Sequence, residues 1–154
     1  MRAMKKILIS AIVSVFLVGL IGNVSAQFSR PEDAISYRKS VMLIIGHHFG
    51  RLGDMLKGVT PYEQDGFANN ASLIQQLSAL PWEAFLTAGS DKGNTTMKAS
   101  VLKNPEKFKK ISQNFEEETA RLVDVAKGND VDAVKRQFGK VAKSCKECHR
   151  HSRK

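Results

Sequence analysis

The C-terminal stretch, residues 130–154, reads DVDAVKRQFGKVAKSCKECHRHSRK and decides what fold the chain can adopt. Its apolar positions are separated by alternating steps of three and four residues; they are Val131, Val134, Phe138, Val141, Cys145 and Cys148. This seven-residue pattern predicts a helix that begins at Asp130 and turns one apolar stripe toward the core of a helix bundle. Both cysteines therefore belong to the stripe that faces the core.

The end of this stretch, Cys145-Lys146-Glu147-Cys148-His149, has the C-x-x-C-H spacing of a c-type haem attachment site. Thiols three residues apart on a helix can each form a thioether to a haem vinyl group, and the following histidine can then be the axial ligand of the iron. His149 follows Cys145 by four residues, so it projects from nearly the same face. We therefore expect one covalent haem c that enters the bundle interior, with His149 bound to its iron.

Three other interpretations of the two cysteines are weaker. A thioredoxin-like redox pair normally follows a strand and opens a helix, and no such context precedes Cys145. A zinc site needs two further ligands, of which His151 could supply one at most. The third interpretation is that two cysteines occupy core positions by chance and have no chemical role. Haem attachment is favoured because the motif agrees with the helix phase and with the lack of other cysteines in the chain.

Three more helices are predicted upstream, because apolar residues recur at helical spacing between breaks that contain glycine or proline. They cover residues 31–57, about 65–88 and 104–127, with a kink at Pro81 and a polar loop at 89–96. The second carries Leu73, Leu77, Leu80 and Phe85, and Arg38 lies on or beside the apolar stripe of the first, which is unusual for a core face. We therefore expect an all-α protein, an antiparallel up-down four-helix bundle with covalently bound haem c.

The N-terminal residues 1–26 have the composition of a secretory signal peptide. Arg2, Lys5 and Lys6 precede an almost wholly apolar run from Ile7 to Ile21, and small residues follow up to Ala26. An uncleaved membrane anchor is the alternative, but this run is shorter than the roughly 20 residues that a membrane span needs. We expect cleavage after Ala26, export to the periplasm, and a mature bundle at residues 27–154.

The chain is basic, with a formal net charge of +9. Three of the basic residues and none of the acidic ones lie in the predicted signal peptide, so the mature chain would still carry +6 from 21 basic and 15 acidic residues. A positive surface favours acidic partners or an anionic membrane surface. A redox partner protein is a separate expectation, which follows from the predicted haem. Nucleic acid as a partner is disfavoured because the chain is expected to be exported.

With these residues identified, the chain resembles the cytochrome c′ family over essentially its whole mature length. The matching segments are Arg30-Pro31-Glu32-Asp33-Ala34 with Tyr37-Arg38, His48-Phe49-Gly50-Arg51, Lys57-Gly58 with Pro61-Tyr62, Leu80-Pro81-Trp82, and Ala142 to His149 with Arg153. The haem motif on the last helix is the most specific of these features. The resemblance implies a haem whose iron has five ligands, with His149 on the proximal side and Met42 closing the distal side.

The resemblance also implies roles for further residues and partners. Arg38 would lie near a haem propionate, Arg153 beside the proximal histidine, and Lys39, Thr96 and Met97 along the haem edge. Nitric oxide and carbon monoxide would be the ligands, the protein would form a homodimer through its first two helices, and no catalytic residues are expected. The chain departs from the family at Ser152, where an aromatic residue is frequent, and at residues 99–102, where proline and tryptophan are frequent.

Met42 separates two functions that the sequence leaves open. If its side chain only packs over the haem, the iron has a free position and the protein binds gases. If its sulfur ligates the iron as a sixth ligand, a low-spin Met/His haem suited to electron transfer results. The spacing of residues cannot place a sulfur within bonding distance, so we favour the first reading on the resemblance alone.

Overall fold

The computed structural model describes residues 27–154, and the predicted signal peptide at 1–26 lies outside that range. The helices are α2 (Pro31–Leu56), α3 (Gln64–Ser78), α4 (Trp82–Leu86), α5 (Ser100–Lys103), α6 (Pro105–Ala126) and α7 (Val131–Ser152). Within the described range there is no β-strand, only an isolated β-bridge between Met97 and Arg153. None of these helices is both long and apolar enough to cross a membrane.

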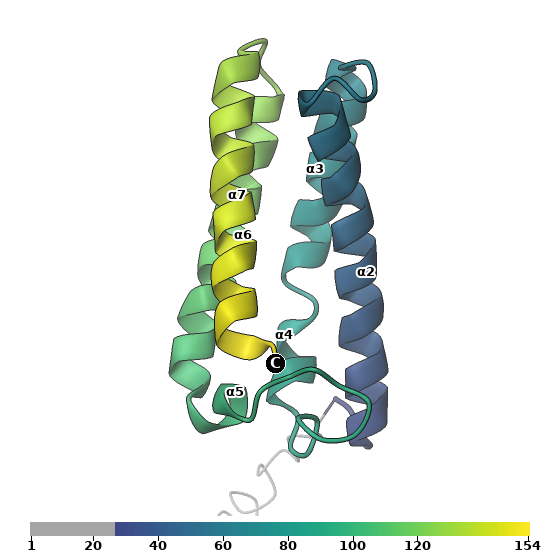
Figure 1. The fold of residues 1–154 in the computed structure, drawn as a ribbon, viewed down its shortest axis with the longest axis vertical. Coiled ribbons are helices and arrows are strands. Elements are labelled where there is room, and N and C mark those ends of the chain that lie inside the picture. The colour runs from purple at the N-terminus through teal and green to yellow at the C-terminus, as the bar shows by residue number, and fades with distance from the viewer. Residues whose placement is uncertain (1–26) are drawn as a thin grey trace, which may run out of the picture.

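Four long segments run side by side along the molecule, as Figure 1 shows. Helices α2, α6 and α7 form three of them, and α3 followed by α4 forms the fourth. Consecutive segments run in opposite directions and pack on one another, α2 against α3, α3 against α6, and α6 against α7. The expected all-α four-helix bundle is confirmed.

The ends of the helices follow from short-range chemistry that the sequence displays. Pro31 opens α2 with two acidic residues in its first turn, which suits the positive end of a helix dipole. The side chain of Asn104 accepts a hydrogen bond from the backbone of Lys107 at 3.3 Å, and Asp130 accepts one from Ala133 at 2.9 Å. These two caps satisfy amide groups that the first turns of α6 and α7 would otherwise leave unpaired.

The interior consists of two groups of buried apolar side chains. The larger lies among the four long segments and includes Leu52, Phe67, Leu122 and Val141. The smaller lies at the end of the bundle that carries the C-terminus; it contains Met97, Val101, Phe108 and Cys148. Trp82, the first residue of α4, packs against both groups and joins them. The interruption expected at Pro81 therefore places a large aromatic ring between the two parts of the core.

The apolar stripe expected on the second helix is out of phase with the observed packing. Leu73 and Leu80 are each 42% exposed, whereas α3 buries Phe67, Asn70, Ala71 and Ile74. The buried Asn70 explains the difference. Because this polar residue lies among the buried positions of α3, a search for regularly spaced apolar residues does not identify those positions. Its amide oxygen contacts the His48 ring nitrogen at 2.7 Å, and its amide nitrogen donates to the Gly66 carbonyl at 2.6 Å.

Helices α2 and α7 are joined at one level by an aromatic stack. The rings of Phe49 and Phe138 lie parallel, 4.3 Å apart between centroids. Gly53 lies beside this stack, and a Cβ there would lie 3.4 Å from the Phe138 ring, at the limit of ordinary contact. Elsewhere the two backbones stay further apart than those of the other neighbouring long segments. Side chains such as those of the stack therefore make most of the contact between α2 and α7.

The short helix α5 was not expected from the sequence. It has only four residues, too few for an apolar period, and a single buried side chain, Val101. It packs on α4, α6 and α7 and so closes the end of the bundle near the C-terminus. Tertiary contact alone accounts for so short a helix, because isolated helices of this length do not form in water.

We expect Phe67→Ala to lower the free energy of unfolding by about 3–5 kcal/mol, since the Phe67 side chain is fully buried and its removal leaves a cavity. Guanidinium denaturation of the haem-loaded protein, followed by circular dichroism, measures the change. Val59→Ala is the control, because Val59 is 70% exposed and should cost less than about 0.5 kcal/mol. Equal losses in the two variants would contradict the assignment of Phe67 to the core.

Candidate functional site

The three residues of the haem motif lie in the last turns of α7, at the end of the bundle closed by α5. Cys148 is 8% exposed, Cys145 is half-buried, and both thiols are free. His149 is exposed and lies four residues after the half-buried Cys145, at the edge of the apolar stripe. The reason is helical geometry, since the residue after the buried Cys148 is turned about 100° away from it.

The two thiols are protonated at neutral pH. Burial raises the pKa of Cys145 to about 11, and burial also raises the pKa of Cys148 above its ordinary value. A redox-active C-x-x-C pair needs the opposite, a lowered pKa that creates a thiolate. The sulfur of Cys148 also contacts the Ser152 hydroxyl at 3.6 Å, and that hydroxyl donates to the Cys148 carbonyl at 2.6 Å. The environment is that of a buried pair of neutral thiols.

The imidazole of His149 is held neutral by its surroundings. Partial burial is the larger cause that lowers its pKa, and the positive charge of Arg153 is the second. The pKa of His151 is lowered as well, first by burial and then by Lys107 and Lys98. A neutral imidazole is the form that binds metals. Within residues 27–154 no three His, Cys, Asp or Glu side chains gather as a metal site, so the zinc interpretation gains no support.

The stack of Phe49 on Phe138 fixes the register between α2 and α7. Because the two helices are antiparallel, a step of seven residues from each stacked ring leads in the same direction, by about 10 Å. The step leads to Met42 on α2 and to Cys145 on α7, which therefore lie at one level. Both side chains are half-buried and pack against the larger apolar group. Met42 on α2 thus lies at the level of the haem motif on the neighbouring helix α7.

Arg38, one turn before Met42 on α2, is buried with 3% of its surface exposed. Its guanidinium donates to the Ala84 carbonyl at 2.8 Å, to the Ser90 hydroxyl at 2.9 Å and carbonyl at 2.6 Å, and to the Thr95 hydroxyl at 2.8 Å. It also lies over the Phe85 ring, 4.9 Å from the centroid. Burial lowers the pKa of this group. No carboxylate of residues 27–154 forms an ion pair with it.

The loop that binds Arg38 is hydrogen-bonded to the C-terminal residues of the chain. The backbone amide of Lys98 donates to the Ser152 carbonyl at 2.8 Å, and that of Lys154 donates to the Thr96 carbonyl at 2.7 Å. Met97 and Arg153 form the β-bridge between these two bonds, and Met97 is 3% exposed. Three residues assigned to the site by resemblance, Thr96, Met97 and Arg153, are thus brought together beside the haem motif.

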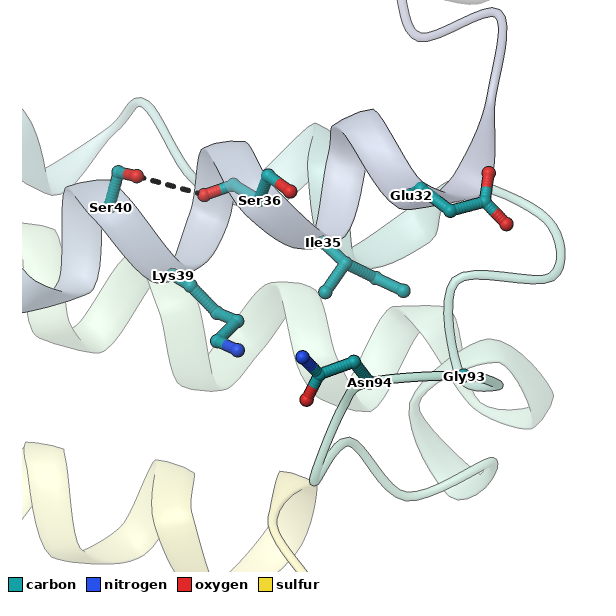
Figure 2. Close-up of a pocket in the computed structure, with 7 residues that line it drawn as sticks. All are labelled: Glu32, Ile35, Ser36, Lys39, Ser40, Gly93 and Asn94. Atoms are coloured by element: carbon teal, nitrogen blue, oxygen red, sulfur yellow. Dashed lines mark hydrogen bonds between the residues drawn. The ribbon is translucent and has the colours of Figure 1, made fainter.

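A surface pocket of about 340 Å³ opens beside this loop, between its residues Gly93 and Asn94 and the first turns of α2. Figure 2 shows Lys39 and Asn94 pointing toward one another across it, with Ile35 between the helix and the loop. Lys39 is exposed, unlike its neighbour Arg38. The structure therefore separates the two predicted residues, placing Arg38 in the interior and Lys39 at a surface opening.

Several residues of the site were not identified from the sequence. Ser90 and Thr95 bind Arg38, Ala84 contributes a carbonyl, and Phe85 lies under the guanidinium. The available signal was weak, since it consisted of polar residues in a glycine-containing loop. Trp82 was expected only as packing, yet its indole N–H is buried without a hydrogen-bond partner in the described part of the chain.

The donor set and the interior both fit haem c. Two neutral thiols three residues apart can add to two vinyl groups, and the adjoining neutral imidazole can ligate the iron. The buried N–H of Trp82 has no acceptor among residues 27–154, and the buried charge of Arg38 has carbonyl and hydroxyl acceptors there but no carboxylate. Haem carries two propionate carboxylates, which are acceptors of this kind.

Comparisons with known proteins agree on one family. The family model described as Cytochrome C′ matches residues 33–153. Cytochrome c′ from Alcaligenes xylosoxydans xylosoxydans is 36% identical over 128 residues, which cover 83% of this chain and 98% of that protein. The solved structure of cytochrome c prime from Shewanella frigidimarina superposes with a TM-score of 0.80 at 36% identity, covering 83% of this chain and 99% of that one.

Ligand complexes are among the similar solved structures. Variants of cytochrome c prime from Alcaligenes xylosoxidans have been solved with nitric oxide bound and with carbon monoxide bound. Their TM-scores to this chain are 0.77 and 0.76, each at 35% identity, covering 83% of this chain and 98% and 99% of theirs.

We expect Arg38→Met to free the loop at residues 87–96, since the variant keeps much of the side-chain volume but loses every hydrogen bond to Ala84, Ser90 and Thr95. Hydrogen exchange followed by mass spectrometry should show the loop amides exchanging about tenfold faster or more, with α6 unchanged. Lys39→Met is the matched control, because Lys39 is exposed and makes none of these bonds. Unchanged exchange in the loop would refute the anchoring role of Arg38.

Proposed function

The chain belongs to the cytochrome c′ family and carries covalent haem c, and on this basis we propose that it is an exported haem protein that binds nitric oxide and carbon monoxide. The single observation that carries the proposal is the C-x-x-C-H motif on the last helix of a bundle whose similar solved structures include nitric oxide and carbon monoxide complexes.

The thiols of Cys145 and Cys148 hold the haem through thioether bonds, and His149 is the one protein ligand of its iron. The i and i+3 spacing on α7 and the neutral state of both thiols support this assignment. The exposed position of His149 is compatible with it, because a side chain that is not packed in the core is free to turn toward an attached group. When bound, haem c supplies an iron that can take a small gas as a further ligand.

Met42 closes the distal side as an apolar cover and leaves the iron with five ligands. Its level opposite Cys145 and its half-buried position support this role. The side chains in contact with the larger apolar group include Met42 and the half-buried Tyr37. Cleavage of a bound oxygen species needs an acid or base, which an apolar cover does not supply, so we assign the protein a binding role with electron exchange rather than an enzymatic one.

The remaining site residues position the haem and control its surroundings. Arg38 is a preorganised cation for a propionate, since four hydrogen bonds already hold its guanidinium in place. Arg153 lies beside His149, and after burial its charge is the second cause that lowers the pKa of that imidazole. Thr96 and Met97 are held beside α7 by the backbone bonds to the C-terminus and border the haem edge, and Lys39 lies at the neighbouring surface opening.

The protein forms a homodimer through α2 and α3. Three large apolar side chains are exposed on these two helices, with Leu43 at 75%, Ile44 at 44% and Leu73 at 42%. Exposed apolar residues that gather on adjacent helices mark a protein interface more often than a free surface. A twofold axis would bring this patch against itself.

The protein acts in the periplasm as residues 27–154. The composition of residues 1–26 supports export and cleavage after Ala26, and haem attachment through thioethers belongs to that compartment in bacteria.

Optical and electron-paramagnetic spectra of the purified ferric and ferrous protein test the function. We expect high-spin ferric spectra and a large change when nitric oxide is added to the ferrous form. Cys148→Ala should shift the pyridine haemochrome band, because one thioether becomes a vinyl group, and His149→Ala should lose the proximal-ligand signature. His151→Ala is the matched control, since it removes an imidazole two residues away from the proposed ligand.

A low-spin spectrum with a methionine-to-iron band, indifferent to nitric oxide, would overturn this proposal in favour of an electron-transfer haem. Met42→Leu distinguishes the two functions directly, because leucine is apolar but has no sulfur. It should leave the spectra unchanged if Met42 is only a cover, and should convert them to high spin if Met42 is a ligand.

We expect Leu43→Glu to weaken the dimer about tenfold or more, because it places a carboxylate at the most exposed large apolar side chain of α2. Sedimentation velocity over a range of protein concentrations measures the change. Val59→Glu is the control, since Val59 is also exposed, at 70%, but lies in the turn after α2. A monomeric parent protein, or equal effects of the two variants, would contradict the proposed interface.

A further inference from the structure

Charge is distributed very unevenly along the α6–α7 pair. Residues 98–110 and 139–154, which form the end with the haem motif, contain eleven basic side chains and two acidic ones. Residues 111–138, which form the other end, contain four basic and six acidic side chains. Since α6 and α7 are antiparallel neighbours, the two basic segments lie at the same end of the bundle. Short helix α5 packs on both and lies at that end.

The basic residues of the haem end are exposed and unpaired. They are Lys98, Lys103, Lys107, Lys109, Lys110, Lys140, Lys143, Lys146, Arg150, Arg153 and Lys154, of which all but the half-buried Lys98 are exposed. No ion pair within residues 27–154 includes any of them. By contrast, each of the four basic residues at the other end has an acidic neighbour within ion-pair distance: Arg121, Lys127, Lys135 and Arg136.

Helix stability does not account for this arrangement. Basic residues in the last turn of α7 do suit the negative end of its dipole, which explains Arg150. Lys107, Lys109 and Lys110, however, lie in the first two turns of α6, at the positive end of its dipole, where a cation is unfavourable. The concentration of like charges at this end is unfavourable for folding, so another selective reason must account for it. The two propionates of haem c would offset only a small part of the excess positive charge.

From this charge distribution we infer that the haem end of α5, α6 and α7 is a docking surface for an acidic protein that exchanges electrons with the haem. The inference rests on the proposed attachment at Cys145 and Cys148, because that attachment places the cofactor next to Lys146 and Arg150. A separation of charge over roughly 30 Å, the length of these helices, also orients the approaching partner before contact. A partner so steered arrives at the end where the haem is held.

An acidic protein fits this surface better than an anionic membrane does. A peripheral membrane surface combines basic residues with exposed apolar side chains that enter the lipid. In the described part of the chain the exposed large apolar residues are Leu43, Ile44, Val59, Leu73, Leu80 and Leu86, and none lies on α5, α6 or α7. The polar groove between α6 and α7 is lined by two lysines, Lys140 and Lys143, and two glutamates, Glu118 and Glu147, so it adds no net charge to this surface.

The test compares two variants of the haem-loaded protein with the same net charge. Lys143→Glu with Lys146→Glu reverses two charges at the haem end. Lys57→Glu with Lys127→Glu reverses two at the opposite end, after α2 and α6. The probes are a short poly-glutamate peptide, titrated by NMR at low and at moderate salt, and ferricyanide, whose electron exchange with the protein is followed by stopped flow. Haem content is measured by absorbance in every sample.

We expect the peptide to shift amide signals of α5, α6 and α7 at the haem end, and salt to weaken that binding. The haem-end variant should lose affinity and ferricyanide rate by about tenfold at low salt, where screening is weak, and the other variant should stay near the parent. Equal losses in both variants would show an effect of net charge alone and overturn the inference. So would binding to vesicles of phosphatidylglycerol and phosphatidylcholine with no binding to the peptide.

A failure of the proposed attachment looks different in the same experiment. In that case the parent protein would lack covalent haem in its absorbance spectrum, while the peptide titration would still report where acidic groups bind. Normal haem content together with peptide shifts spread over both ends of the bundle would overturn the docking surface and leave the attachment intact.

Discussion

A buried cation that forms no ion pair with any residue of 27–154 is the constraint on which the site depends. The guanidinium of Arg38 is held inside the protein by carbonyl and hydroxyl groups alone, and these come from α4 and from the loop that follows it. Burial of an unpaired charge is costly unless every donor is satisfied. The path of the loop is therefore dictated by Arg38, and the loop in turn brings Thr96 and Met97 to the C-terminal residues of α7.

Much of this arrangement could be predicted from the sequence, where local chemistry is strong. The start of α2 at Pro31, the caps at Asn104 and Asp130, and the break at Pro81 follow from side-chain chemistry, and the structure confirms them. Other features depend on contacts between distant segments. The buried face of α3 includes the polar residue Asn70, so it does not appear as an apolar stripe in the sequence. Helix α5 has too few residues to show a repeating apolar pattern. Likewise, no local pattern in the sequence shows that Ser90 and Thr95 accept hydrogen bonds from the Arg38 guanidinium.

The candidate site shows the same division. A five-residue motif identifies the thiols and the imidazole, because their chemistry requires one helical turn. The apposition of Met42 and Cys145 instead depends on the Phe49–Phe138 stack between two helices far apart in the chain. The exposure of His149 depends on how α7 is turned against its neighbours, which the five-residue motif does not specify. The uneven charge along α6 and α7 can be counted in the sequence, but its gathering at one end follows from their antiparallel packing.

The β-bridge between Met97 and Arg153 has a consequence for the order in which the bundle folds. The loop that binds Arg38 is joined to residues 152–154 by backbone hydrogen bonds. These contacts and those of Arg38 join residues more than fifty positions apart in the sequence, which slows their formation relative to contacts within a helix. The loop therefore takes its place late, after the long helices that carry its partners have packed.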